Sequence, residues 1–361
     1  MLRFIQIYLL PGAVFQSVMV GGGYGTGRET VQFFTQYGLG GGLLGQAVAT
    51  VGAAVVFALS LEIARAYRVW DYRSFFRVLL GRFWFVYEVL ALTLGVLVIA
   101  VIGAAAGGIM EEELGLPAWI GVIIILAAVA VLTFYGRDVV TRVLALWSVV
   151  LYGVFLAYLT LVIVGESEAM GAAFSTATVE PGWFTSGMQY VFYNITAIPL
   201  VLFAARAIET RRQAFVSGVV GAMIAMLPGV LLHISFAAAW PGIIEEALPV
   251  YMMLGMIGSG ALTLAYIVML FGTFIETGVG NVQGFLERVQ SWRAETGRAE
   301  LAPVFRAAIA VGVMVLAAVL STIGVVDLIA DGYGTLAWGF LFVYVLPLLT
   351  IGVWRIYQAP G

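Results

Sequence analysis

The chain has 361 residues, of which 62% are hydrophobic and only 10% are charged, and its formal net charge at pH 7 is −3. A soluble domain of this length would carry about a quarter charged residues, so the composition excludes an ordinary soluble globular protein. Cysteine is absent, which excludes disulfides, thiolate metal sites and cysteine nucleophiles. All 17 cations are arginine, which excludes Schiff-base chemistry on a lysine.

Apolar runs of roughly twenty residues recur along the chain, which is the length that an α-helix needs to cross a bilayer. We predict an all-α integral membrane protein, a single transmembrane domain over 1–361, with about ten transmembrane helices. The first apolar run follows Met1-Leu2-Arg3 and has no small-residue cleavage pattern after it, so we expect a retained helix and not a signal peptide. The predicted spans are 8–36, 39–64, 83–109, 117–135, 141–164, 184–206, 212–240, 259–286, 303–326 and 332–356.

Charge tests this topology, because the cytoplasmic links of membrane proteins carry an excess of basic residues. If the N-terminus is cytoplasmic, 16 of the 17 arginines fall in cytoplasmic segments, and Arg28 is the exception. The external links carry acidic residues instead. We therefore expect a multi-pass protein of the cell membrane (the inner or plasma membrane) with both termini in the cytoplasm.

Two long links occupy corresponding places in the two halves of the chain. The link after the second span, about 65–82, is cytoplasmic, and the link after the seventh span, about 241–258, is external. Five spans in each half, with opposite orientation and matched links, are typical of an inverted repeat. The predicted repeats are about 8–164 and 184–356.

Glycine interrupts the first span. The segment Val20–Glu29 contains five glycines in seven consecutive residues, and each glycine disfavours a helix by about 1 kcal/mol relative to alanine. Close helix packing through small residues is the alternative explanation. We predict instead a break near Gly22 and a restart at Thr26, with Glu29 completing a capping box. A half-helix that starts inside the membrane points its amides and positive dipole end at a ligand. The predicted substrate-binding residues of this segment are Gly22, Gly23, Tyr24, Gly25, Thr26 and Gly27.

The sixth span contains a second interruption. Pro199 has no N–H and its ring crowds the carbonyl of Ile195, so we expect 194–198 to be kinked or unwound. A plain proline kink is the alternative, but broken helices at matching places of two inverted halves are where transporters build their binding sites. The predicted substrate-binding residues of this span are Tyr190, Tyr193, Asn194 and Thr196.

These segments resemble a known family. Gly22–Glu29, followed by Gln32-Phe33-Phe34, is similar to the signature G-x-G-[FY]-x-[ST]-G-[RQ]-E-x-x-x-F-F of the YkvI-like membrane proteins. The segments 190–199, 273–280 and 331–334 resemble that family as well. The family is regarded as a branch of the amino acid–polyamine–cation superfamily with the LeuT-type fold of five plus five helices.

The resemblance implies a secondary transporter in which helices 1 and 6 carry the central site and helix 8 faces helix 1. It also implies that helices 1, 2, 6 and 7 rock against helices 3, 4, 8 and 9. The chain lacks the Asp-Pro-Gly-Asn and Met-Pro-His motifs of manganese and iron carriers with this fold. A metal substrate is therefore not expected.

Charged residues inside the membrane are costly and are functional candidates by default. We expect Arg28 to pair with Asp331 or Asp327 in an external gate that also includes Glu29. Glu88 lies close to the cytoplasmic links, and we expect it to snorkel or to pair with a loop arginine. The predicted ion-binding residues, for sodium before proton, are Val20, Gly23, Thr273, Glu276 and Thr277.

Other function classes fit the sequence less well. An intramembrane hydrolase would need His233, the only histidine, to pair with a nucleophile such as Ser259, and we expect His233 to be a satisfied histidine of the bundle. A channel or an uncoupled facilitator or exchanger is the main alternative. No basic patch indicates nucleic acid, and no cofactor is implied beyond Na⁺. The prediction is a secondary active transporter of a small amino acid or related zwitterion, whose carboxylate meets the amides of 25–27, with membrane lipids as its surroundings.

Overall fold

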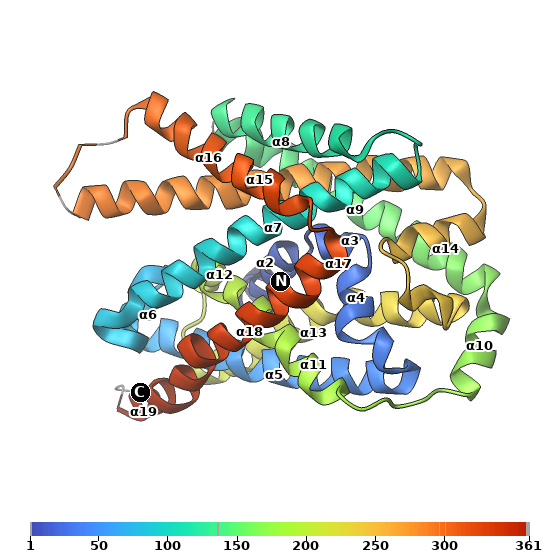
Figure 1. Ribbon diagram of the computed structural model, residues 1–361. Coiled ribbons are helices and arrows are strands. Elements are labelled where there is room, and N and C mark those ends of the chain that lie inside the picture. Colours follow the sequence, from blue (N-terminus) through green and yellow to red (C-terminus); the bar gives the residue numbers. More distant parts are fainter. Residues whose placement is uncertain (1, 136, 296, 300, 359–361) are drawn as a thin grey trace.

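The computed structural model describes residues 2–135, 137–295, 297–299 and 301–358. Every regular element in these ranges is a helix. The long helices run lengthwise through the molecule, and the short helices α6 (Tyr72–Leu80) and α10 (Ser167–Ser175) lie at its opposite ends (Figure 1). The C-terminal helix α19 (Val353–Gln358) lies at the same end as α6 (Figure 1).

The remaining helices follow the predicted spans. In the first half they are α1 (Leu2–Phe4), α2 (Leu10–Met19), α3 (Gly22–Gly25), α4 (Arg28–Phe33), α5 (Leu39–Tyr67), α7 (Trp84–Glu112), α8 (Ala118–Tyr135) and α9 (Arg137–Gly165). In the second half they are α11 (Trp183–Asn194), α12 (Ile198–Val201), α13 (Arg211–Phe236), α14 (Pro249–Ile257), α15 (Gly260–Glu295), α16 (Pro303–Ser321), α17 (Val325–Asp327) and α18 (Gly334–Phe340). Three π-helical stretches complete the last span, at Leu328–Tyr333, Leu341–Val345 and Leu348–Gly352.

The prediction of an all-helical, multi-span membrane protein is confirmed. Within the described ranges, eight helical segments are long and apolar enough to cross a membrane. A ninth results if Val150–Gly165 and Ser167–Ser175, which are bent by 72°, form one span. The remaining predicted segment, 117–135, contains the shorter apolar helix Ala118–Thr133. Its parent helix α8 has 18 residues, which is about 27 Å, slightly less than the hydrocarbon thickness of about 30 Å.

Each of the two long links contains a short helix, α6 in the first and α14 in the second. Helix α6 starts at Asp71, whose side chain accepts a hydrogen bond from the Ser74 amide at 2.9 Å. Its apolar side is buried, and the Phe76 ring stacks on Tyr87 with 3.6 Å between centroids. The link after the second span therefore docks on α7 and does not hang free in solvent.

Small residues let the backbones of α2, α5 and α13 approach closely, as is common where membrane helices pack. A Cβ added at Gly12 would lie 2.4 Å from the Gly221 Cα, and one at Gly218 would lie 2.5 Å from the Ala58 Cα. His233 on α13 is fully buried, and its ring nitrogens lie 2.9 Å from Thr35 Oγ1 and 2.9 Å from the Leu39 carbonyl oxygen. The histidine is thus a satisfied member of the bundle.

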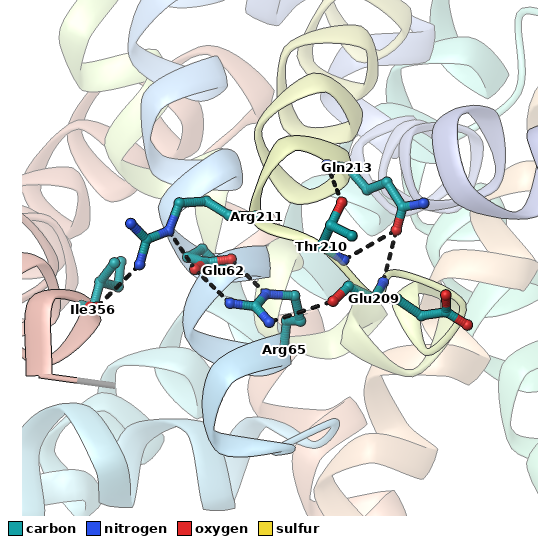
Figure 2. A network of polar contacts seen from close by, with 7 residues as sticks. All are labelled: Glu62, Arg65, Glu209, Thr210, Arg211, Gln213 and Ile356. Atoms are coloured by element: carbon teal, nitrogen blue, oxygen red, sulfur yellow. Dashed lines mark hydrogen bonds and ion pairs between the residues drawn. The ribbon is translucent and has the colours of Figure 1, made fainter. Parts of the chain in front are cut away.

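A polar network joins α5, α13 and α19 near the end of the molecule that carries α6 (Figure 2). The fully buried Glu62 carboxylate accepts hydrogen bonds from Arg65 Nε at 2.8 Å and from Arg211 Nε at 2.9 Å. Arg211 also donates to the Ile356 carbonyl at 3.3 Å, and Arg65 donates to the Glu209 carbonyl at 3.4 Å. Two arginines from different elements thus compensate one buried carboxylate, which holds these three helices together.

Candidate functional site

The first span is interrupted twice. Helix α2 ends at Met19, and Val20 leaves the helix with ψ of 89° before the single turn α3 begins at Gly22. A second interruption lies at Gly27, whose φ of 83° is in the left-handed region that favours glycine, and α4 follows it. The predicted break is confirmed, with two interruptions in place of one.

The predicted capping box is not formed. The N-cap of α4 is Gly27, which makes no side-chain cap, and the Thr26 hydroxyl donates to the Gly23 carbonyl at 3.0 Å. Because Gly27 takes the left-handed conformation, the chain turns before α4 and Glu29 no longer faces back toward Thr26. The Glu29 carboxylate instead accepts a hydrogen bond from the Tyr193 hydroxyl at 2.5 Å, across to the sixth span.

The sixth span changes its helical winding at the predicted place, but it remains helical from Trp183 to Ala205. Helix α11 ends at Asn194, a 3-10 turn covers Ile195–Ala197, and Pro199 lies in the first turn of α12. Thr196 belongs to this turn; its hydroxyl donates to the Tyr193 carbonyl at 2.6 Å. Its own carbonyl accepts a hydrogen bond from the Tyr87 hydroxyl of α7 at 3.0 Å. The turn therefore directs a backbone oxygen toward the third span.

A cavity of about 130 Å³ lies between the two interruptions, with walls from α7, α15 and the last span. Apolar residues of α2 and α7 line much of it. The polar side chains that line it are Glu29, Tyr87, Tyr193, Asn194, Thr196, Thr277, Asn281, Arg288 and Tyr333. Four of these were predicted from the first and sixth spans, and Thr277 was predicted as an ion ligand.

Four polar residues of the cavity were missed by the sequence prediction: Tyr87, Asn281, Arg288 and Tyr333. A signal existed for two of them. Asn281 lies four residues after Thr277 on one helix and therefore shares its face, and Tyr333 belongs to the glycine-flanked segment that resembles the YkvI-like proteins. Tyr87 and Arg288 carried no such signal.

The amides that were predicted to bind a carboxylate are already used. The Gly25 amide donates to the Gly21 carbonyl at 2.9 Å, and the Gly27 amide donates to the Tyr24 carbonyl at 3.0 Å. Neither Gly25 nor Gly27 lines the cavity between the broken helices. In this conformation the amides of Gly25 and Gly27 are satisfied within the first span, and the binding of a substrate carboxylate at 25–27 stays a prediction.

Two further predicted residues lie away from the cavity. Tyr190 packs its ring against Phe33 and Phe34, with centroids 5.7 and 4.8 Å away, and is a core residue. Tyr24 lines a different, smaller cavity together with Gly25. Gly23 lies next to the carboxylate of the first span, since a Cβ added there would be 2.5 Å from Glu29 Oε1.

The predicted ion-binding residues divide between two places. Val20 and Thr273 line the smaller cavity, of about 30 Å³, while Thr277 lines the larger one. Glu276 is half-buried and lines neither of these two cavities. The Gly23 carbonyl accepts the Thr26 hydroxyl. Of the predicted ion-binding residues, Val20 and Thr273 thus line the same cavity, whereas Glu276 and the Gly23 carbonyl lie elsewhere.

Helix α15 packs on the broken segment of the first span, as the resemblance implied. A Cβ added at Gly21 would lie 3.7 Å from Thr277 Cγ2, and one at Gly25 would lie 2.4 Å from Leu270 Cδ1. The Tyr266 hydroxyl donates to the Gly25 carbonyl at 2.8 Å. The segment Tyr266–Thr277 of the eighth span therefore faces the interruption.

Arg28 is bound by the link that precedes α14. Its Nη1 donates to the carbonyl oxygens of Ile244 and Glu246, both at 2.9 Å, and its Nη2 donates to Gln32 Oε1 at 2.9 Å. The side chain is buried. One guanidinium thus fastens the start of α4 to two backbone carbonyls of this link.

The predicted ion pair of Arg28 with Asp331 or Asp327 is not seen among the described residues. The Val250 amide, in the first turn of α14, donates to the Thr26 carbonyl at 3.1 Å, which brings the link preceding α14 next to Arg28. The predicted partner of Arg28 is therefore wrong for this conformation. Neutral backbone carbonyls, and not an aspartate, hold Arg28.

Glu88 behaves as predicted for an acid near the membrane surface. Its carboxylate lies 3.5 Å from Arg73 Nη2 and accepts a hydrogen bond from the Tyr72 hydroxyl at 3.2 Å. Arg73 and Tyr72 both belong to α6 in the first long link. The pairing of Glu88 with a loop arginine is confirmed.

Comparisons with known proteins agree with this architecture. The chain is 26% identical over 362 aligned residues to the uncharacterized membrane protein YkvI of Bacillus subtilis strain 168, over 96% of this chain and 95% of YkvI. No protein-family model matches the chain.

Solved transporter structures share the fold at low sequence identity. A Na⁺-coupled sialic acid symporter, in a substrate-bound outward-open state, superposes with a TM-score of 0.62 at 12% identity, covering 94% of this chain and 78% of the symporter. A manganese transporter of Eremococcus coleocola gives a TM-score of 0.57 at 16% identity, covering 96% and 79%. The chain is thus an integral membrane protein that is similar in sequence to YkvI and has the LeuT-type fold.

Proposed function

We propose that the protein is a secondary active transporter that carries a small amino acid or a related zwitterion by alternating access. One observation carries this proposal: a cavity with polar walls lies between the interrupted first span and the 3-10 turn of the sixth span. Broken spans in matching halves are where transporters of this architecture place their substrate. The two named structural relatives are transporters, which supports the class and leaves the cargo of this chain open.

The arrangement of the two long links suggests which side is closed. The arginine pattern places the link before α14 outside and α6 inside. On the outer side, Arg28 is bonded to that link and Thr26 to the first turn of α14. On the inner side, the cavity extends to Arg288, which lies in an arginine-rich cytoplasmic segment. The proposed state is therefore closed to the outside and faces the cytoplasm.

Opening of the outer side should require the Arg28 contacts to break. We expect Arg28→Gln to favour the outward-open state by about tenfold or more, since hydrogen bonds to a charged group contribute about 1.5–3 kcal/mol each. The chain has no cysteine, so Ala197→Cys in the cavity wall offers a single labelling site. Its rate of modification by an external, membrane-impermeant thiol reagent should rise in the Arg28→Gln background.

Arg206 provides a matched control, because it is exposed and lies on the cytoplasmic side of the predicted topology. Arg206→Gln should leave the labelling rate unchanged. An unchanged rate in Arg28→Gln as well would show that these hydrogen bonds do not hold the outer side closed.

We further propose that a cation drives transport, sodium before proton. Support comes from Val20 and Thr273, which line one small cavity on the side of α15 that faces the break. The Thr273 hydroxyl donates to the Met269 carbonyl at 3.0 Å, so its oxygen lone pairs are available to a cation. Backbone carbonyls at a helix break and hydroxyls on a facing helix are hard oxygen donors of the kind that hold sodium in such carriers.

Uptake of radiolabelled standard amino acids into proteoliposomes tests both proposals. We expect accumulation under an imposed inward sodium gradient at equal pH, and Thr273→Ala should lower the apparent sodium affinity by about tenfold. Thr160→Ala is the matched control, because its hydroxyl makes the same helical hydrogen bond, to Leu156, on an exposed surface.

Accumulation driven by a pH gradient without sodium, and lost in Glu276→Gln, would instead identify a proton-coupled carrier. If neither gradient drives accumulation, the protein is an uncoupled facilitator or exchanger, and conduction without saturation would indicate a channel.

A further inference from the structure

We propose that the Glu29 carboxylate binds the ammonium group of the transported solute, so that the site takes small amines whether or not they carry a carboxylate. This inference rests on the proposed transport function and narrows its substrate class. It starts from the position of one acidic side chain within the cavity between the broken spans.

Glu29 is only 4% exposed, yet its side chain lines the cavity. The Tyr193 hydroxyl donates to Oε2 at 2.5 Å, and among the described residues Oε1 has no hydrogen-bond partner. A buried carboxylate is strongly disfavoured unless a cation or several donors compensate its charge. One hydroxyl leaves most of that requirement unmet.

In the described part of the chain, no arginine is seen to compensate the charge of the Glu29 carboxylate. The neighbouring Arg28 is turned away and bonded to the carbonyls of Ile244 and Glu246. Arg288 lines the same cavity, but it follows Thr277 by eleven residues on one helix, which places it about 16 Å further along. Arg288 therefore lies toward a different part of the cavity from Thr277, and an ammonium group of the ligand would supply the positive charge that Glu29 lacks.

The walls around Glu29 suit an organic cation better than a metal ion. The rings of Tyr193 and Tyr333 lie 5.0 Å apart between centroids, and both residues line the cavity. Aromatic faces attract ammonium groups through cation–π interaction, whereas alkali ions are held by several oxygens that replace their water shell. No group of three or more His, Cys, Asp or Glu side chains that could hold a metal occurs in the described residues.

The cavity also limits the size of the solute and the role of a carboxylate. Its volume of about 130 Å³ is well below the roughly 300–1,000 Å³ of sites for drug-sized ligands. The amides of Gly25 and Gly27 are bonded within the first span, so they offer no anion site. Recognition of the amine is therefore the dominant polar interaction, and removing the carboxylate of the solute should cost little affinity.

Matched sets of small molecules test this directly. The first set is alanine, ethylamine and propionate, and the second is leucine, 3-methylbutylamine and 4-methylpentanoate. Each is added at millimolar concentration to the purified protein, and the melting temperature is measured, because a ligand that binds only the folded state raises it. We expect amines and amino acids of at least one set to raise the melting temperature, and the two carboxylic acids to have no effect.

Two variants and one control locate the site. Glu29→Gln should weaken amine binding by at least about tenfold, the loss expected when a charge-assisted hydrogen bond is removed. Tyr193→Phe, which keeps the ring and deletes only the hydroxyl, should weaken it less. Glu111→Gln removes an exposed acid outside the cavity and should leave binding unchanged.

Several outcomes would overturn the proposal: binding of the carboxylic acids as strong as that of the amines, no effect of any amine, or unchanged binding in Glu29→Gln. A shift caused by sodium chloride alone and lost in Glu29→Gln would make Glu29 an ion ligand instead. If Glu29→Gln does not fold, the comparison of amine, amino acid and carboxylic acid on the wild-type protein still tests whether the site recognises the ammonium group.

Failure of the transport proposal is distinguishable from these outcomes. Amines that bind through Glu29 but are never accumulated in proteoliposomes would leave the ammonium site standing and remove the transporter. Accumulation of carboxylic acids without amine binding would support the transporter and rule out the ammonium site.

Discussion

Gly23→Leu is expected to abolish solute uptake while the protein still inserts and folds. A Cβ at position 23 would lie 2.5 Å from Glu29 Oε1 and 2.8 Å from Ile329 Cδ1, so a larger side chain would push the Glu29 carboxylate out of place. Overpacking of this kind costs about 1–3 kcal/mol, which lowers the melting temperature by a few degrees and leaves a folded protein. Uptake into proteoliposomes and melting in detergent, measured side by side, separate the two effects.

Two comparisons sharpen this test. Gly280→Leu is the matched control, because Gly280 is exposed on α15 and a Cβ there meets nothing within 4 Å. Gly25→Leu probes the opposite side of the same turn, where the added Cβ would lie 2.4 Å from Leu270 Cδ1 of α15, and it should also abolish uptake. Uptake retained in both Gly23→Leu and Gly25→Leu would assign these glycines to helix packing alone.

The second large effect is expected on stability, from removing both arginines that surround Glu62. The double substitution Arg65→Ala and Arg211→Ala leaves a fully buried carboxylate without a cation. Breaking a buried pair in this way typically costs about 3–5 kcal/mol, so we expect a large fall in the melting temperature. Each single substitution should cost less, because the other arginine still contacts the carboxylate (Figure 2).

A third substitution distinguishes charge from packing. Adding Glu62→Leu to the double variant removes the uncompensated charge, and much of the lost stability should return, since apolar replacement of buried ion pairs is often neutral. Arg206→Ala, at an exposed arginine of the same link, should change little. A double variant as stable as the wild type would mean that water or another group solvates Glu62.

Much of the fold follows from local properties of the chain. The apolar runs and the one-sided distribution of arginine predict a multi-span helical protein, because the bilayer demands about twenty apolar residues per helix and basic residues favour the cytoplasm. The glycines around Gly23 predict where the first span breaks, and the ring of Pro199 predicts where the sixth span changes its winding, because both residue types act on their own backbone. These predictions need no knowledge of neighbouring helices.

The site residues were predicted less completely, because side chains in the cavity come from several distant segments. Asn194 and Thr196, which were predicted from a single helix to bind substrate, line the cavity. Glu29 was predicted to cap its own helix, but it bonds to Tyr193, 164 residues away. Arg28 was predicted to pair with an aspartate, but its partners are backbone carbonyls. Every residue has a backbone carbonyl, so the sequence does not indicate which residues provide these partners.

The sequence by itself thus determined the membrane class, the positions of the spans and the places of their breaks, since these depend on hydropathy, charge and backbone preference within short stretches. Only the tertiary structure decided the direction of each polar side chain near the breaks. The reason is the backbone at Gly27: with φ of 83°, the regular rotation of 3.6 residues per turn is lost, and helical spacing no longer predicts which face Arg28 and Glu29 occupy. Their partners are set by how the link before α14 and the sixth span pack against α4.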